Sequence, residues 1–227
     1  MSRPSTIATW NRNPADEESM GAAHAPIWRR MIDVSVPHDL RQSTVLDYGC
    51  NQGGFLRLLY DRHPFKGAVG IDIARESVAR AELLKGQRPL DYKVTDSAAS
   101  LGQTFDYAFS HEVIYLLADL SAHVRDMRAA LRVGGAYVAA MGCHTDSSVW
   151  PRWRKLIAEH SSIPIYDHSL EEVSKAFAEA GFNVSVRPLA LDAFMPFTSG
   201  SAYFPKVMDQ LHYYSSEKVL FRFVRVP

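Results

Sequence analysis

The stretch that decides the fold runs from Thr44 to Gly54 and reads Thr-Val-Leu-Asp-Tyr-Gly-Cys-Asn-Gln-Gly-Gly. Its first part is apolar and partly β-branched, which predicts a strand over Thr44–Asp47. Glycines follow where the chain must turn into a helix, and they let a ligand approach the backbone without meeting a Cβ atom. A strand, a glycine-rich turn and a helix in this order begin a βαβ unit.

Short apolar runs continue to alternate with amphipathic stretches beyond this turn. A helix after residue 169 is marked by a capping box, in which Ser169 precedes Glu172 by three residues. This alternation predicts an α/β fold, a three-layer Rossmann-like sandwich with a seven-stranded, mostly parallel sheet and an antiparallel last strand. Besides Thr44–Asp47, the predicted strands span residues 68–73, 90–95, 105–110, 136–141, 182–189 and 219–226.

The chain is expected to form a single domain over residues 1–227, with two additions to its core (43–189 and 218–227). Residues 1–42 are predicted to be an N-terminal helical cap, in which Pro26 interrupts the first of two covering helices. Residues 190–217 are an aromatic insertion, interpreted as a substrate lid, with simple packing over the sheet as the alternative. In the cap, the residues that either close over a ligand or pack on the surface are Trp10, Arg12, Trp28 and Arg29.

Composition excludes several classes of function. The 25 lysines and arginines balance the 25 aspartates and glutamates, so no net charge steers the 227-residue chain onto nucleic acid or an anionic membrane. No apolar run approaches the ~20 residues of a membrane span, and no signal peptide is evident, so we expect a cytoplasmic protein. Two cysteines, Cys50 and Cys143, form no CxxC pair, so no metal site is expected.

Acidic residues stand where the first three predicted strands end, at Asp47, Asp72 and Asp96. Ligands of open α/β sheets bind beyond the carboxyl ends of the strands, so these acids are candidate ligand contacts. For Asp47 there is an alternative, which is to cap the following helix. Asp72 is suitably placed to accept hydrogen bonds from ribose hydroxyls. The turn does not match the G-x-G-x-x-G pattern of pyrophosphate binders, and its acidic start would repel phosphate. The charge therefore favours a cationic or zwitterionic ligand.

These residues resemble the class I S-adenosylmethionine-dependent methyltransferases. The stretch Val45–Gly53 is similar to the first motif of that family, and Asp72 and Asp96 resemble its ribose-binding and adenine-binding acids. Further similarities lie in residues 105–109, 131–135 and 169–182, so that the resemblance covers residues 43–189. Asn51 stands where the family most often has its middle glycine, and asparagine tolerates positive φ better than most residues.

The resemblance implies methyl transfer from S-adenosylmethionine, with S-adenosylhomocysteine as product, to an oxygen or nitrogen of a small molecule. The expected partner is this small methyl acceptor, and no binding to nucleic acid or to a membrane is expected. The chain is expected to be a monomer or a homodimer. The residues expected to contact the cofactor are Asp47, Gly49, Cys50, Asn51, Gly53, Asp72, Ile73, Asp96, Ser97, Ser110, His111 and Glu112.

A general base is needed only if the acceptor must lose a proton. The candidates near predicted strand ends are His111, Tyr115 and His144, with His168 farther along the chain, and for each histidine a surface or core role competes. His111 and Glu112 could also be solvated residues of a short helix. Two alternative functions stay open: a non-catalytic S-adenosylmethionine-binding module and a nicotinamide-dependent oxidoreductase.

Overall fold

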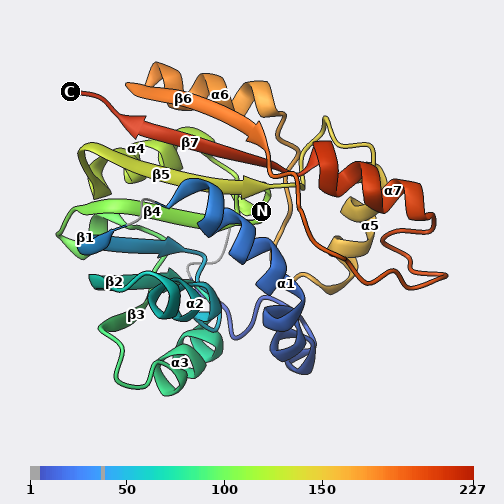
Figure 1. The fold of residues 1–227 in the computed structure, drawn as a ribbon, viewed down its shortest axis with the longest axis horizontal. Helices are drawn as coiled ribbons and strands as arrows, with labels where there is room; N and C mark the ends of the chain where they lie inside the picture. Colours follow the sequence, from blue (N-terminus) through green and yellow to red (C-terminus); the bar gives the residue numbers. More distant parts are fainter. Residues whose placement is uncertain (1–5, 37–38) are drawn as a thin grey trace.

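A seven-stranded sheet forms the centre of the computed structural model, which describes residues 6–36 and 39–227. The strand order is β3-β2-β1-β4-β5-β7-β6, as Figure 1 shows. Strand β7 is antiparallel to both of its neighbours, whereas the pairs among β1 to β5 are parallel. The predicted sheet, with its antiparallel last strand, is thus confirmed. The strands are β1 (Leu40–Tyr48), β2 (Phe65–Asp72), β3 (Leu90–Val94), β4 (Phe105–His111), β5 (Leu131–Met141), β6 (Phe182–Pro188) and β7 (Val219–Arg225).

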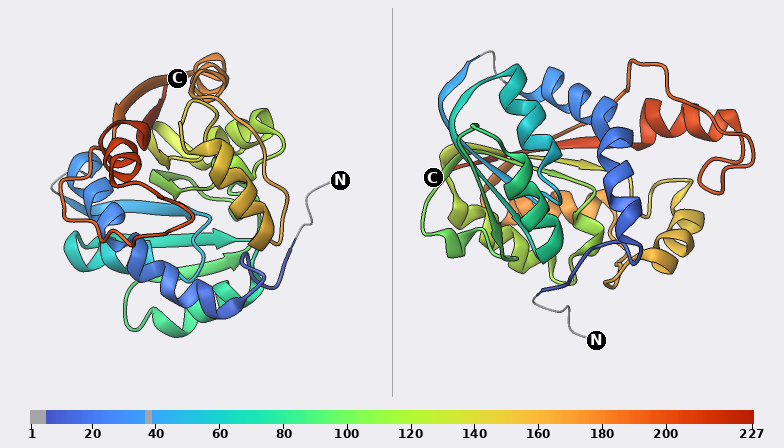
Figure 2. Two further views of the ribbon diagram at one scale, coloured as in Figure 1. Left: turned by 90° about the vertical axis from the view of Figure 1, so that its right-hand side faces the viewer. Right: turned by 90° about the horizontal axis from the view of Figure 1, so that it is seen from below.

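Helices cover both faces of the sheet, which makes the three predicted layers (Figure 2). On one face, α1, α2 and α3 bury apolar side chains such as Met31, Phe55 and Val78. On the other, α4 and α6 bury side chains such as Met127 and Phe177. The helices are α1 (Pro14–Ser35), α2 (Gly54–Arg62), α3 (Arg75–Leu84), α4 (Leu120–Ala130), α5 (Trp150–His160), α6 (Leu170–Glu179) and α7 (Val207–His212), with short turns η1 (Ala99–Leu101), η2 (Ile114–Leu116) and η3 (Tyr213–Glu217).

Strands β1, β2 and β5 begin four, three and five residues earlier than predicted, respectively. For β1, the burial pattern gives the reason. Leu40 is buried and pairs with Phe65, but the register with β2 shifts between Leu40 and Thr44. The exposed Arg41 and Gln42 between them break the apolar pattern, so the sequence alone shows only the inner half of the strand.

The N-terminal cap contains one helix where two were predicted. Helix α1 runs through Pro26 without interruption. The ring of Pro26 removes one backbone N–H, but Ala22, whose carbonyl loses its partner, is exposed and can bond to water. Burial of Ile27, Met31 and Ile32 against the sheet offsets the cost and keeps the helix intact.

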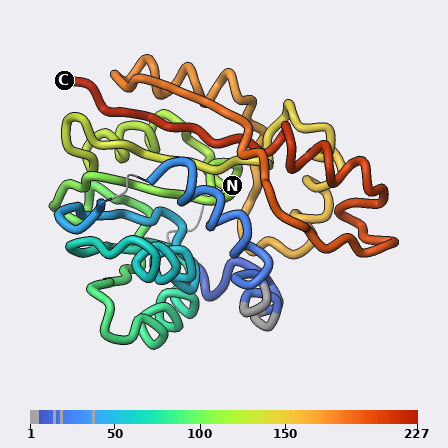
Figure 3. Tube along the Cα trace, in the orientation of Figure 1, coloured from blue at the N-terminus to red at the C-terminus, as the bar shows by residue number. Residues whose placement is uncertain are grey.

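Elements beyond the carboxyl ends of the parallel strands complete the fold. Helix α5 carries Pro151 in its first turn, and α6 begins at the predicted Ser169–Glu172 capping box, which confirms that prediction. In Figure 3, residues 190–217 leave the end of β6, pass α5 and return to β7. Among the described residues, no helix combines the length and the apolar character that crossing a bilayer requires.

Candidate active site

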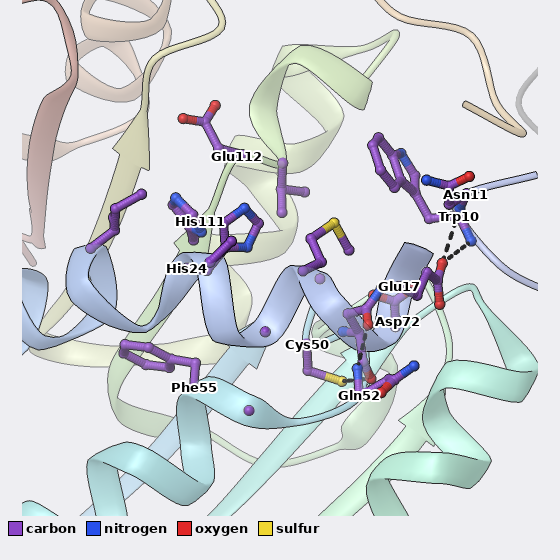
Figure 4. A pocket seen from close by; sticks show the side chains of 18 of the residues that line it. Trp10, Asn11, Glu17, His24, Cys50, Gln52, Phe55, Asp72, His111 and Glu112 are labelled. Carbon is purple, nitrogen blue, oxygen red and sulfur yellow. Dashed lines mark hydrogen bonds between the residues drawn. The ribbon is translucent and has the colours of Figure 1, made fainter. Parts of the chain in front are cut away.

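A cavity of about 1180 Å³ lies beyond the carboxyl ends of β1, β2 and β4 (Figure 4). The turn after β1 and the ends of these strands form its floor. Helix α1, helix α5 and the segment that leads into β7 form its walls. This is the edge of the sheet where ligands of α/β proteins bind, so the strand ends that the sequence singled out meet in one place.

The turn between β1 and α2 uses three residues with positive φ. Gly49 has φ 77°, Asn51 φ 46° and Gly53 φ 72°. The expected left-handed asparagine is confirmed, and its side-chain Oδ1 accepts a hydrogen bond of 2.7 Å from the backbone N–H of Gln52. A Cβ atom at Gly49 would lie 2.5 Å from Cγ2 of Val113, so the turn packs closely against the end of β4.

Asp72 connects this turn to the end of β2. Its Oδ2 accepts from the backbone N–H of Asn51 at 2.9 Å, and its Oδ1 accepts from that of Ala74 at 2.9 Å. The carboxylate lines the cavity at the end of β2. Asp96 lines the cavity from beyond β3, held by a bond of 2.8 Å from the Tyr48 hydroxyl to its backbone carbonyl.

Asp47 is a buried carboxylic acid in the cavity floor, 4% exposed. Burial and the neighbouring Asp72 raise its pKa from 3.8 to about 8. Its Oδ2 finds no hydrogen-bond partner among the described residues. The helix-capping alternative fails, because the residue that caps α2 is Gly53. Asp47 is thus a buried acid with an oxygen left unpaired by the part of the chain that the structure describes. It lies beside a turn in which Gly49 and Gly53 carry no Cβ atom, and this arrangement fits the cationic end of S-adenosylmethionine.

His111 lies at the end of β4 against the cap. Its Nδ1 accepts a hydrogen bond of 3.2 Å from Nε1 of Trp28, on α1. The ring of His24 stands perpendicular to that of His111, with 4.6 Å between the ring centres. Burial and the charge of Lys218 lower the pKa of His111 well below 6.5 and that of His24 to about 4, so both rings are neutral. Neither His111 nor Glu112 is a solvated residue of a short helix.

Glu112 forms a buried ion pair with Lys218, which is 2% exposed. Burial alone would raise the pKa of Glu112, but Lys218 and backbone N–H groups hold it below its usual value. One of these groups is the N–H of Cys143, at 3.2 Å from Oε2. Glu112 has φ 55°, an unfavourable conformation for this residue type that the ion pair helps to maintain.

The N-terminal segment that includes Trp10, Asn11 and Glu17 lines the cavity and connects α3 with α5. Oε1 of Glu17 accepts from the backbone N–H groups of Trp10 and Asn11 at 2.6 and 3.0 Å, and Oε2 accepts from the Ser77 hydroxyl at 2.6 Å. Figure 4 shows Glu17, Trp10 and Asn11 together at one end of the cavity. The N–H of Arg12 donates to the carbonyl of His160 at 2.8 Å, which ties the segment to α5.

Most residues expected to contact the cofactor line the cavity, and three do not. The Ser110 side chain bonds instead to the Tyr137 hydroxyl at 2.6 Å, and that of Ser97 to Asp126 at 2.6 Å. Gly53 packs against the ring of Tyr92. Those that line it are Asp47, Gly49, Cys50, Asn51, Asp72, Ile73, Asp96, His111 and Glu112.

The structure separates the four expected base candidates. His111 and Tyr115 line the cavity, but burial raises the pKa of Tyr115 well above its usual value. His144 and His168 do not line it. The Nε2 atoms of these two histidines lie 2.8 Å from the carbonyl oxygens of Glu217 and Leu117, respectively.

Sequence reasoning missed His24, His160 and Lys218 as cavity residues. His24 and Trp28 are one helical turn apart, a spacing that places both on one face, but the expected break at Pro26 concealed it. Nε2 of His160 lies 3.3 Å from the Tyr203 hydroxyl, and Lys218 reaches Glu112 across 106 residues. These pairings leave no local sequence signal.

Comparisons with known proteins give the family. Residues 21–185 match the model of the methyltransferase domain family. Over 108 residues, the chain is 33% identical to a ubiquinone biosynthesis O-methyltransferase from Methylobacterium sp. (strain 4-46), a match covering 46% of this chain and 43% of that enzyme. The chain therefore spans less than half the length of that curated relative.

Solved structures share the fold. The methyltransferase in a complex with the Haloferax volcanii Trm112 methyltransferase activator is 21% identical, with a TM-score of 0.81 over 94% of this chain and 95% of that one. The geranyl diphosphate C-methyltransferase of Streptomyces coelicolor A3(2), solved with S-adenosylhomocysteine, is 15% identical, with a TM-score of 0.68 over 98% and 92%. The chain therefore belongs to the methyltransferase domain family.

Proposed function

We propose that the chain is an S-adenosylmethionine-dependent methyltransferase and that it methylates an oxygen or nitrogen of a small molecule bound in the cavity. The observation that carries the proposal is the size of this cavity. Pockets for one small ligand occupy about 300–1,000 Å³, and this cavity of about 1180 Å³ has room for a cofactor and a second small molecule.

The cap and the segment 190–217 form the acceptor end of this space. Tyr203, Phe204, Tyr213 and Tyr214 line the cavity, in agreement with a role of this segment as a lid. Phe194 is fully exposed and lies outside the lining, so only the second half of the segment contributes. The proposed division is a cap at 1–42, a cofactor-binding core at 43–189 and 218–227, and a lid at 190–217.

When bound, the cofactor supplies a methyl group on a positively charged sulfur. The residues of this chain position the two reactants and exclude water. Asp72 and Asp96 are placed to hold the ribose and adenine, Asp47 accommodates positive charge, and the wall of His24, Trp28 and His111 meets the acceptor. The similarity to a ubiquinone biosynthesis O-methyltransferase supports a small acceptor.

The experiment uses methyl-labelled S-adenosylmethionine with the purified chain and a cell extract separated into small-molecule, protein and nucleic acid fractions. We expect label in the small-molecule fraction, and the labelled product, examined by mass spectrometry and NMR, to carry an O- or N-methyl group. Label confined to a macromolecule, or a C-methyl product like that of the geranyl diphosphate enzyme, would overturn the proposal.

We propose that the enzyme works as a monomer or homodimer. A competing possibility is an activator protein, because the Haloferax volcanii methyltransferase with a TM-score of 0.81 was solved with one. Light scattering during gel filtration gives the mass of the purified chain, and turnover of the isolated chain tests the need for an activator. Activity that appears only after adding a Trm112-type protein would overturn the proposal.

A further inference from the structure

The cavity wall made by His111 and Lys218 carries hydrogen-bond donors that the described residues leave unused. Trp28 Nε1 can only donate, so the Nδ1 of His111 that meets it must accept. The neutral ring then carries its proton on Nε2. That atom is buried and has no partner among the described residues. His111 therefore presents a donor and does not provide the base that its position in the sequence suggested.

Lys218 adds a second donor beside it. Its ammonium has three N–H groups, and among the described residues Oε1 of Glu112 is the oxygen that accepts from it. The ring of Tyr213 lies 5.8 Å from Nζ. Glu112 also accepts from the N–H of Cys143, so its charge is already compensated. The ion pair is neutral, and Lys218 keeps donors for a ligand.

We propose that Lys218 and the Nε2–H of His111 form an oxyanion subsite, and that the methyl acceptor is an aromatic carboxylate or phenolate whose anionic oxygen binds there. The inference rests on the proposed function. Two donors on one wall match the lone pairs of an oxyanion, whereas an amine or amide N–H at the same place would face them unfavourably. The aromatic rings of Phe204, Tyr213 and Tyr214 surround the space in which the acceptor ring would lie.

The test measures binding of matched probes to protein saturated with S-adenosylhomocysteine, by titration calorimetry at pH 8.5. One pair is 2-naphthoate and its carboxamide, and the other is 4-nitrophenolate and nitrobenzene, so the two arms separate carboxylate from phenolate. We expect at least one anion to bind about tenfold more tightly than its neutral partner, the effect of a charge-assisted hydrogen bond.

Two variants test whether His111 and Lys218 cause this preference for the anion. His111→Phe removes the N–H and keeps a ring, and the double variant Lys218→Met with Glu112→Gln removes both charges so that neither remains buried alone. Each should reduce the preference to within about threefold. Lys206→Met removes a lysine charge on the exposed N-cap of α7 and should keep the preference. Thermal unfolding with S-adenosylhomocysteine verifies that each variant is folded.

The proposal is overturned if acids and neutral probes bind alike, if no anion binds, or if the preference survives in both wall variants. If S-adenosylhomocysteine binds and a neutral small acceptor is methylated, the proposal of an oxyanion subsite is wrong and the proposed function stands. Failure to bind S-adenosylhomocysteine would remove both.

Discussion

The two ends of the cavity are built in different ways. At the cofactor end, the turn after β1 bonds to Asp72 over 21 residues of sequence. At the acceptor end, Trp28 meets His111 over 83 residues, and Lys218 meets Glu112 over 106. The cofactor end is thus made by neighbouring βα units, whereas the acceptor end depends on how the cap and the last strand pack. Changes at one end should leave ligand binding at the other largely intact.

The largest expected effect is at Asp72. Asp72→Ala removes the proposed ribose acceptor and two bonds to the backbone of the turn. We expect S-adenosylhomocysteine to bind about 100-fold more weakly, as expected from the loss of one or two charged hydrogen bonds. Titration calorimetry measures this affinity. Asp96→Ala serves as the comparison and should weaken binding less, because Asp96 is more exposed than Asp72. Equal weakening by the wall variant Lys218→Met with Glu112→Gln would contradict the separation of the two ends.

The next effect is a pH dependence from Asp47. Its pKa is about 8 when folded and 3.8 ordinarily, so the folded state holds a proton that the unfolded state has lost. The free energy of unfolding without ligand should therefore fall as pH rises from about 4 to about 8. A cation binds the ionised form better, so cofactor affinity should rise with pH by up to about tenfold per unit below pH 8.

Asp47→Asn is the matched control for this pH dependence. Both slopes should flatten in the variant, as measured by urea unfolding and calorimetry between pH 5.5 and 8.5. Unchanged slopes would show that another group is responsible.

A smaller effect is expected at Gly142, at the acceptor end. A Cβ atom there would overlap the Tyr213 hydroxyl oxygen and would lie 2.9 Å from Oε1 of Glu112. Gly142→Ala should cost about 1–3 kcal/mol and lower the melting temperature by several degrees, without weakening cofactor binding. Adding Tyr213→Phe removes the closest atom and should recover part of the loss. A melting temperature equal to that of the wild type would contradict the close approach.

The smallest effect is expected at Asn51. Asn51→Gly relieves the cost of φ 46° but removes the side-chain bond to Gln52. These contributions oppose each other, so stability should change by less than about 1 kcal/mol and cofactor affinity by only a few fold. A large gain in affinity would show that the asparagine side chain obstructs the cofactor.

Local pattern predicted the parts of the fold whose signal lies within a few residues. The strands, the Ser169–Glu172 capping box and the left-handed Asn51 belong to this group. The uninterrupted α1 does not, because its continuity through Pro26 depends on apolar contacts with the sheet. The prediction for Ser110 failed for a related reason. Its side chain bonds to the hydroxyl of Tyr137 on β5 and does not line the cavity.

The sequence by itself determined that acids and glycines stand at the carboxyl ends of the first strands, because the period of the βα units puts them there. It therefore identified the cofactor end. Only the tertiary structure decided what faces the acceptor, because the protonation of His111 depends on Trp28 and the charge of Glu112 is balanced by Lys218. Hydrogen bonds and ion pairs act over a few ångströms of space, whatever the separation along the chain, so only folding brings these groups within reach.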